Sequence, residues 1–359
     1  MERRRFIVTM SRMLGAGALP LAMPGCVIRA GSRSFRMWTW VRGNGERTAD
    51  EWLAHFSRLH DAGISGVLVS GSSDQAIEAA RSVGLEFHRW IWVLNRSGDT
   101  WVKEEHPEWF TVSREGKSSL EYPPYVGYYN WVCPTRPAVR EYLRTVVERI
   151  AGMPGVDAVH LDYIRQSDVI LPVGLWPRYG LVQDQEYPQF DFCYCDVCRN
   201  AFYAQSGKDP LELQDPPSDL EWREFRWNSL TQLVTILADA VHGRGKRISA
   251  AVFPTPTIAR DLVRQAWERW PVDAVFPMIY HAFYNRPVDW IGDATAEGVT
   301  ALGGRRPLYS GLYLPDLSPE QLGEAAASVR EAGAAGVSMF ESEGLSDDHV
   351  RSLRETLQA

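Results

Sequence analysis

The sequence predicts an α/β protein, specifically a (β/α)8 TIM barrel with long insertions after the third and fourth strands. Short β-type runs alternate with stretches whose apolar residues recur every three or four positions, the pattern of parallel strands joined by crossover helices. The 359 residues, 45% of them hydrophobic, suffice for one barrel with insertions. An open, doubly wound sheet is the alternative. It is disfavoured because no glycine-rich phosphate loop opens the first helix.

The expected elements alternate along the chain. Strands are predicted at residues 35–41, 66–69, 86–93, 158–164, 248–253, 274–280, 308–314 and 336–340. Helices are predicted at residues 48–62, 74–83, 137–151, 222–242, 259–270, 288–296, 319–332 and 347–357. The insertions, residues 95–135 and 165–220, leave from the C-terminal ends of strands, where barrel enzymes build their active sites. Function is therefore expected at that face.

Residues 1–30 have the form of an export signal, ahead of a single barrel domain at residues 31–359. Arginines at positions 3–5 precede an apolar stretch that ends at Cys26. The arginines resemble a twin-arginine signal, and Gly25 before Cys26 resembles a bacterial lipoprotein cleavage site. An ordinary cleaved signal with an incidental cysteine is the alternative. We expect a bacterial protein that is periplasmic, or anchored to the membrane through lipidated Cys26.

Charge and aromatic content bear on the class of ligand. A formal charge of −7 and a calculated pI of 5.7 do not favour binding to a phosphate backbone, so nucleic acid is not an expected partner. Fourteen Trp and fourteen Tyr offer flat rings that stack on sugar faces, although about half of them are expected in the core. A carbohydrate is the ligand class that this composition favours.

Asp162 is the first candidate catalytic residue. Alternation along the fourth strand places His160 and Asp162 on the inward side, with Asp162 near the C-terminal end where it can meet a substrate. The alternative is a structural carboxylate neutralised by Arg165 or by another basic residue within the barrel mouth. Tyr163 and Arg165 follow directly and, together with His160, are candidate substrate-binding residues.

A second carboxylate is needed for ordinary glycoside hydrolysis, because one group protonates the leaving oxygen while the other is nucleophile or base. The eighth strand ends near Glu341 and Glu343. Glu341 is predicted to be the acid, with a surface or helix-capping role as its alternative, and Glu343 is predicted to bind substrate. The sixth strand brings Tyr280 and His281 to the rim, where either can bind sugar hydroxyls and His281 can act as acid or base.

Aromatic and cationic residues on two other strands complete the candidate binding site. Trp38 and Trp40 lie on the first strand, and Arg89 and Trp92 lie on the third. They are predicted to face inward and form a sugar platform, with ordinary core packing as the alternative for some of them.

Four cysteines form a separate constellation. Cys193, Cys195 and Cys198 lie close together in the second insertion, and Cys133 ends the first. Closely spaced cysteines joined by a distant fourth favour tetrahedral zinc, in a structural site without an open coordination position. Two disulfides or free thiols are the alternatives, although cysteines one or two residues apart pair only with strain.

Several segments resemble the glycoside-hydrolase-like family 10 proteins and related glycosyl hydrolase barrels. These are the runs His106-Pro-Glu-Trp-Phe110, Gly116-Lys-Ser118, Trp131-Val-Cys-Pro134, Val159-His-Leu-Asp-Tyr-Ile-Arg165 and Phe276-Pro-Met-Ile-Tyr280. The resemblance spans most of residues 35–345, and the Asp162 segment is its most specific part. It implies a (β/α)8 barrel that acts on, or at least binds, polysaccharide.

The cysteine spacing is similar to that of the zinc site in family 42 β-galactosidases, in which an upstream cysteine is followed by Cys-x-Cys-x-x-Cys. Cys133, Cys193, Cys195 and Cys198 match it residue by residue. No Asn-Glu pair closes the fourth strand, so that family's catalytic glutamates are not carried over. The resemblance implies a structural zinc ion, and nothing indicates an organic cofactor.

We therefore predict an exported glycoside hydrolase that cleaves a poly- or oligosaccharide, with Asp162 as nucleophile or base and Glu341 as acid. A glycan-binding lipoprotein that lacks a competent carboxylate pair is the competing class. A lyase or isomerase with His281 or Tyr280 as base is a third. Carboxylates about 5 Å apart favour retention and about 6.5–9.5 Å inversion, whereas the absence of an acid opposite Asp162 favours a binder.

Overall fold

The computed structural model describes residues 34–43, 47–71 and 73–358. The predicted export signal and Cys26 lie outside the described residues. Among the described residues, no helix combines the length and apolar character needed to cross a bilayer.

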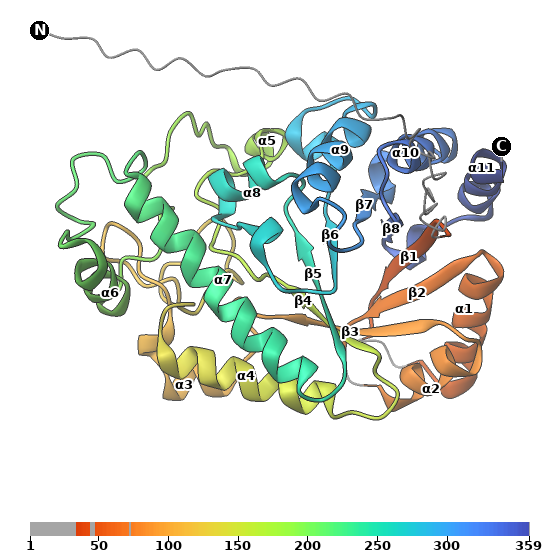
Figure 1. Ribbon diagram of the computed structural model, residues 1–359, viewed down its shortest axis with the longest axis horizontal. Coiled ribbons are helices and arrows are strands. Elements are labelled where there is room, and N and C mark those ends of the chain that lie inside the picture. The colour runs from red at the N-terminus through yellow and green to blue at the C-terminus, as the bar shows by residue number, and fades with distance from the viewer. Residues whose placement is uncertain (1–33, 44–46, 72, 359) are drawn as a thin grey trace, which may run out of the picture. The chain divides into compact units, whose positions relative to one another are not determined.

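Eight parallel strands form the centre of the fold (Figure 1). They are β1 (Arg36–Val41), β2 (Ile64–Val69), β3 (Glu86–Trp92), β4 (Ala158–Asp162), β5 (Arg247–Val252), β6 (Ala274–Pro277), β7 (Tyr309–Tyr313) and β8 (Gly336–Phe340). Ladders join them in the order β6-β5-β4-β3-β2-β1-β8-β7. Parallel bridges from Val275 to Leu308 and from Met278 to Gly311 join β6 to β7 and nearly close the ring. The predicted (β/α)8 barrel is confirmed.

Helices connect and surround the strands (Figure 1). The α-helices are α1 (Ala49–Asp61), α2 (Asp74–Ser82), α3 (Thr100–Glu105), α4 (Pro137–Ala151), α5 (Trp176–Tyr179), α6 (Asp196–Ser206), α7 (Leu220–His242), α8 (Pro256–Val263), α9 (Trp290–Leu302), α10 (Pro319–Glu331) and α11 (Asp347–Gln358). Short 3-10 turns include η3 (Trp267–Arg269) and η4 (His281–Tyr284). The two insertions fall between β3 and α4 and between β4 and α7, as predicted.

Local sequence signals explain where several helices begin. Thr48 caps α1 and Ser318 caps α10, each in a capping box completed by Glu51 or Gln321 three residues later. Each box satisfies backbone N–H groups that otherwise lack a partner in the first turn. These caps fix the starts of the helices that return the chain toward the next strand.

Several predicted boundaries were wrong. The strand predicted at 274–280 ends at Pro277, and the helix predicted at 288–296 is α9, which continues to Leu302. The helix predicted at 259–270 ends as α8 at Val263, because Arg264 adopts a left-handed conformation with φ of +60° and η3 follows. The strand predicted at 158–164 ends at Asp162, because Tyr163 has φ of +50°. Positive φ is unusual for residues other than glycine and is held here by tertiary contacts. The guanidinium of Arg264, for example, is fully buried and paired with Glu186.

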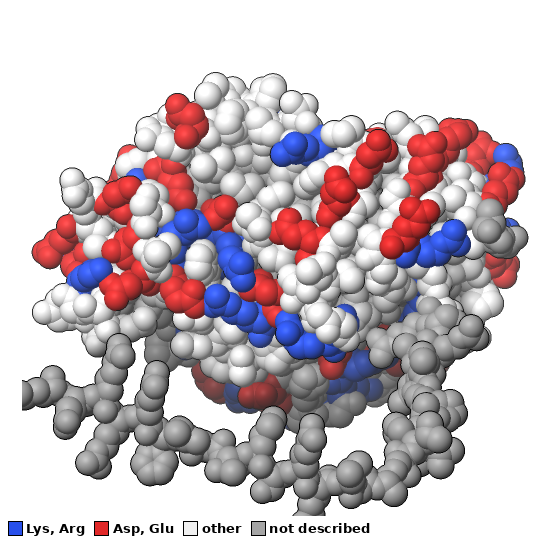
Figure 2. All heavy atoms as spheres, turned by 45° about the horizontal axis from the view of Figure 1, so that its top comes forward, with Lys and Arg blue, Asp and Glu red and all other residues white. Residues whose placement is uncertain are grey.

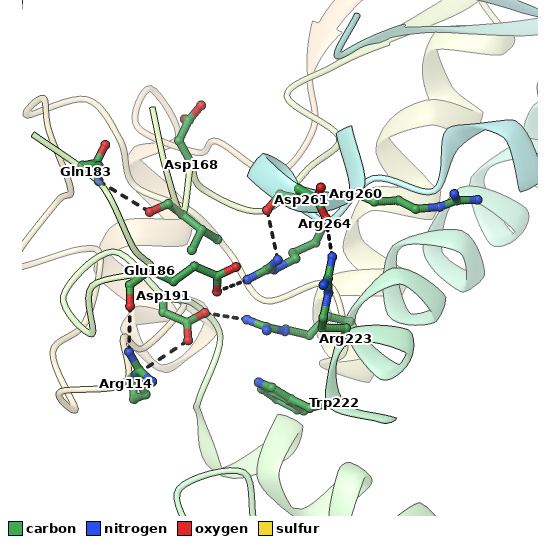
Figure 3. Close-up of polar contacts among 12 residues, drawn as sticks. Arg114, Asp168, Gln183, Glu186, Asp191, Trp222, Arg223, Arg260, Asp261 and Arg264 are labelled. Carbon is green, nitrogen blue, oxygen red and sulfur yellow. Dashed lines mark hydrogen bonds and ion pairs between the residues drawn. The ribbon is translucent and has the colours of Figure 1, made fainter. Parts of the chain in front are cut away.

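The second insertion is joined to the barrel helices by a buried ionic network (Figure 3). Asp191 is fully buried and accepts a hydrogen bond of 2.5 Å from Nη1 of Arg226 on α7. Arg114 of the first insertion pairs with Asp191 at 3.8 Å and donates to the backbone oxygen of Glu186. The charges of Arg226, Arg114 and Arg264 hold the pKa of Asp191 below its usual range even though burial acts to raise it. The network therefore links both insertions to α7 and α8.

Breaking this network from one side should be costly. Arg226→Met leaves Asp191 buried with the hydrogen bond from the Tyr194 hydroxyl and with Arg114 at 3.8 Å as its ionic partner, and we expect a loss of about 3–5 kcal/mol in the free energy of unfolding. Urea titration followed by circular dichroism measures it. The matched control is Arg351→Gln on α11, whose pair with Asp348 is exposed and should contribute less than about 1 kcal/mol. Equal losses of unfolding free energy in the two variants would contradict the prediction that the buried network stabilises the fold more than an exposed ion pair does.

Basic and acidic side chains are interspersed on the face that Figure 2 shows. Ion pairs at or near the surface, such as Arg269–Glu224 and Arg223–Asp261, join neighbouring helices in this way. Such pairs contribute little stability each, so the hydrophobic packing of helices on strands carries the fold.

Candidate active site

A cavity of about 1130 Å³ opens at the C-terminal ends of the strands. Residues from the ends of β1, β3, β4, β6 and β8 line it, together with both insertions. Its aromatic lining consists of Trp90, Trp92, Tyr128, Tyr129, Tyr163, Tyr179, Phe253, Tyr280, Phe283, Tyr284 and Phe340. A large aromatic cavity at this face of a barrel is the expected form of a binding site for an extended, ring-containing ligand.

Asp162 lines the cavity where β4 ends. Its Oδ2 accepts a hydrogen bond from Nε1 of Trp90 at 2.9 Å, and its Oδ1 accepts one from the backbone N–H of Tyr163 at 2.7 Å. Burial raises the pKa of Asp162 above its ordinary value, although both hydrogen bonds and the charge of Arg165 act in the opposite direction. A positioned carboxyl group with a raised pKa is suited to proton transfer.

Trp90 fixes the direction of the Asp162 carboxyl group and also tunes its pKa. In Trp90→Phe the hydrogen bond to the charged form is lost, so the pKa of Asp162 should rise further. If protonated Asp162 is the active form, the alkaline limb of the pH–rate profile should move to higher pH, with a fall of about two- to tenfold in the maximal rate. Rates measured from pH 4 to pH 9 test this. An unchanged alkaline limb would exclude Asp162 as its source.

Arg165 does not neutralise Asp162 in the way that the structural alternative requires. Its Nη1 donates to Asp168 Oδ2 at 2.8 Å, and both side chains are buried. The guanidinium also lies 4.8 Å from the ring centre of Trp131 and 5.3 Å from that of Tyr163. Cation–π contacts and the ion pair together hold the loop that follows Asp162. Arg165 thus holds the loop after Asp162 in place in the cavity wall.

Glu341 and Glu343 follow β8 but turn toward different arginines. Oε2 of Glu341 accepts a hydrogen bond of 2.5 Å from Nε of Arg42, which lines the cavity, although Glu341 itself is not a lining residue. Glu343 accepts from Arg47 at 2.8 Å, and it does not line the cavity either. Burial would raise the pKa of Glu343, but hydrogen bonds from Arg47 and Ser342 outweigh it and lower the pKa.

Tyr280 lies near enough to both candidate carboxylates to be affected by their charges. Burial, together with the charges of Asp162 and Glu341 and the phenol of Tyr313, raises the pKa of the Tyr280 hydroxyl well above its ordinary value. The phenol therefore remains a hydrogen-bond donor and lines the cavity. His281 is buried in η4 and does not line the cavity, and its pKa is lowered by burial.

Three residues predicted to bind the sugar lie deeper than the cavity. Trp38, Trp40 and His160 are buried inside the barrel, where the two tryptophans pack with Phe276. Nδ1 of His160 is 2.9 Å from Oγ of Ser249 on β5, and the ring lies 5.1 Å from Phe276. Sequence periodicity correctly indicates the inward side, but not the depth along the strand. These residues form the floor beneath the cavity instead of its lining.

The exposed aromatic platform is formed by Trp92, Tyr128 and Tyr163. Trp92 is 38% exposed and Tyr128 is 47% exposed, and their ring centres lie 6.2 Å apart. Trp92 also packs against Tyr163 at 4.7 Å. Tyr128 was missed by sequence reasoning, although it belongs to an aromatic-rich run at residues 122–131 that signals such a surface. Arg42, Asp168 and Tyr284 were also missed, because each joins the cavity only through the fold.

The four cysteines form a compact, buried group next to the barrel. Their Sγ atoms all lie within 4.8 Å of one another, with Cys133 to Cys198 at 3.4 Å and Cys133 to Cys195 at 3.7 Å. These separations exclude disulfide bonds, whose sulfur atoms are about 2.05 Å apart. Four sulfurs at about 2.3 Å from a tetrahedral ion lie about 3.8 Å from one another, so the group has the size of a metal site.

The surroundings of the cysteine group also suit thiolate ligands. The backbone N–H of Val112 points at Cys193 Sγ at 3.5 Å, and Cys195 stands at the N-terminus of α6. Burial acts to lower the pKa of Arg136, but the neighbouring Cys195, Asp196 and Cys133 raise it. Amide dipoles and a guanidinium stabilise the negative charge of a four-thiolate site.

Comparison with solved structures identifies barrels of one functional kind. The chain is similar to the glycoside hydrolase domain of PgaB (BpsB) from Bordetella bronchiseptica, with a TM-score of 0.61, 15% identity and coverage of 90% of this chain and 99% of that one. It is also similar to the catalytic domain of β-amylase from Paenibacillus polymyxa, with a TM-score of 0.60, 11% identity and coverage of 91% and 97%. The comparison confirms the (β/α)8 barrel fold.

A third glycoside-hydrolase barrel agrees with this assignment of the fold. The similarity to a class V chitinase from Pseudomonas fluorescens has a TM-score of 0.54 at 10% identity and covers 90% of this chain and all of that one. No protein-family model matches the chain, and no curated protein sequence matches it. At these identities the likeness concerns the fold, so any activity has to be argued from the site.

Proposed function

We propose that this protein is a glycoside hydrolase related to the glycoside-hydrolase-like family 10 proteins. The observation that carries the proposal is the carboxyl group of Asp162, which lies in an aromatic cavity at the C-terminal face of the barrel. Two hydrogen bonds orient this group, and burial raises its pKa. The glycoside-hydrolase barrels that share the fold support it.

The raised pKa of Asp162 supports an exchange of the two roles predicted for the carboxylates. Asp162 is suited to donate a proton to the glycosidic oxygen as the C1–O bond breaks. Glu341, paired with Arg42 of the cavity lining, is then the second carboxylate, which attacks C1 or takes a proton from the attacking water. Tyr280 supplies a hydroxyl donor in the cavity, and Trp92 with Tyr128 stacks on the sugar rings.

The first test is a screen of the purified mature protein against polysaccharides and aryl glycosides, scored by released reducing sugar. Asp162→Asn and Glu341→Gln should both lose turnover. Glu343→Gln is the matched control, because Glu343 lies two residues from Glu341 but turns toward Arg47. Binding without turnover by the parent protein would contradict the hydrolase and support the alternative, a glycan-binding lipoprotein on the same barrel.

For the cysteine group we propose a structural zinc ion held by Cys133, Cys193, Cys195 and Cys198. The group is buried and has four sulfur donors at separations that suit a tetrahedral ion. Four protein ligands fill the coordination sphere of such an ion, so no coordination position is left for a substrate. The ion would hold α6 and the end of the first insertion together, away from the reacting carboxylates.

We further propose that residues 1–30 direct export, and that lipidated Cys26 attaches the protein to a bacterial membrane.

A further inference from the structure

The cavity extends beyond the barrel mouth into a crevice between β3 and α4. Its lining includes Ile91 of β3, Val146 and Ile150 of α4, and Met153, which follows α4. Ser70 and Gly71, which follow β2, also line the cavity. The crevice belongs to the same cavity as Asp162, so one extended ligand can occupy both.

Arg89 lies in this crevice and is not part of the barrel interior that the sequence analysis predicted. Along β3, His88 and Trp90 bond to Ser249 and Asp162 on the inner side, whereas Phe87 packs in the core between strands and helices. Alternation places Arg89 and Ile91 on the outer side with Phe87. The outer face of a barrel strand is normally apolar, because it packs against helices.

The guanidinium of Arg89 lacks a counter-charge. Among the described residues it has neither an ion pair nor a side-chain hydrogen bond, and its Nε is buried without a partner. Burial alone lowers the pKa of Arg89 to about 10. A partly buried cation without an acceptor lowers stability, so an anionic group that binds to it forms a charge-assisted contact that the protein itself does not supply.

The remaining charges of the crevice are also weighted toward cations. Arg96 keeps Nε and Nη2 buried without partners and lies 4.0 Å from Asp99, and Arg149 has no carboxylate partner among the described residues. Asp99 is the acidic residue of this lining, and it already accepts hydrogen bonds from Tyr142 and from the backbone of Val102. Three guanidiniums therefore share one engaged carboxylate.

We propose that this crevice recognises an anionic group carried by a saccharide, a uronate carboxylate or a sulfate ester, with Arg89 as the specificity-determining cation. The inference rests on the proposed function in one respect, because a glycan must occupy the adjoining mouth. The substrate class is then an acidic polysaccharide. A planar guanidinium binds the oxygens of a carboxylate or a sulfate in pairs, which a neutral sugar does not offer.

The test compares polysaccharides that differ only in charge. Binding to the full-length Asp162→Asn protein is measured by calorimetry at low ionic strength. The pairs are a polygalacturonate with its methyl ester, a glucuronate-containing glycan with its carboxyl-reduced form, and a sulfated galactan with its desulfated form. At least one acidic member should bind about 10- to 100-fold more tightly than its neutral partner, and the responding pair identifies carboxylate or sulfate.

Variants of Arg89 decide whether the preference comes from the crevice. With Arg89→Gln added, the acidic member should bind no better than its neutral partner, while Arg89→Lys should keep part of the preference. Arg351→Gln on α11, outside the cavity, should keep all of it. The proposal would be overturned if no pair showed a preference for its acidic member, or if the preference survived Arg89→Gln. It would also be overturned if free sulfate bound as tightly as the acidic glycan.

The unfolding temperature of an Arg89 variant distinguishes a binding role for Arg89 from a structural one, because the two roles predict opposite changes. Arg89→Met should unfold at a temperature no lower than that of the parent, because it removes an uncompensated charge from the crevice. A clear loss of stability would assign Arg89 to the fold and overturn the proposal. Charge-selective binding without turnover would instead contradict only the hydrolase, and turnover of neutral glycans without a charge preference would contradict only this inference.

Discussion

Asp162→Asn is expected to lower the turnover of a natural glycan by about 10²- to 10⁴-fold, the usual contribution of a positioned general acid. The asparagine side chain keeps the size of the carboxyl group and can still accept the hydrogen bond from Trp90 through its oxygen, but it has no acidic proton to transfer to the leaving oxygen. Initial rates on the substrate found in the screen, at matched protein concentrations, measure the loss.

The leaving group distinguishes the acid from the nucleophile. A dinitrophenyl glycoside needs little protonation of its leaving oxygen, so Asp162→Asn should retain much more activity on it than on the natural glycan. Glu341→Gln should lose activity on both substrates, because attack at C1 is still required. Equal losses by Asp162→Asn on both substrates would contradict the acid role and restore Asp162 as the nucleophile or base that the sequence predicted.

Stability of the Asp162 variant provides the folding control, and its sign follows from the raised pKa. Because the folded state disfavours the charged carboxylate, Asp162 lowers stability progressively as the pH rises through its folded pKa, and has no such effect below the unfolded value of about 3.9. Asp162→Asn should therefore unfold at a higher temperature than the parent at pH 7 and lose that advantage near pH 3. A destabilised variant at pH 7 would show that the carboxylate itself supports the fold.

Removal of the metal is expected to have the largest effect on stability. Structural zinc contributes about 10–16 kcal/mol to the folding of small zinc peptides, and here it would tie α6 to the end of the first insertion. Protein purified under reducing conditions should contain one zinc per chain. Cys195→Ala should lose the metal and lower the unfolding temperature by more than 10 °C, a shift of about 5 kcal/mol or more for a domain of this size.

A neighbouring substitution separates loss of the ligand from local damage. Asp196→Asn lies next to Cys195, is exposed and removes only a pair with Arg136, so it should keep the zinc and nearly all of the stability. A chelator should lower the unfolding temperature of the parent and leave Cys195→Ala unchanged. Protein without zinc that is as stable as the metal-loaded form would contradict the structural role, and four thiols that bind no metal would contradict the site.

The sequence alone was sufficient for the architecture, because hydrophobic periodicity reports directly which side of each element is buried. The strand at 336–340 and the helix at 137–151 were predicted to the residue, and the two insertions were placed at the correct strand ends. The cysteine spacing also predicted a common site, since thiols that ligate one metal ion must converge wherever the chain passes. Asp162 was likewise placed at the cavity by simple alternation along β4.

The sequence could not show how deep a side chain lies in the barrel, which way it turns, or which distant residues it contacts. Alternation marks Trp38 and His160 as inward but does not say that the cavity ends above them. Glu341 and Glu343 have the same chemistry two residues apart, and only packing turns them toward different arginines. Arg89 appears one residue from Trp90, yet the pleat places it on the opposite face of β3, in a crevice that exists only once α4 has packed there. A single chain encodes these contacts only through elements far apart in sequence, which is why the tertiary structure had to decide them.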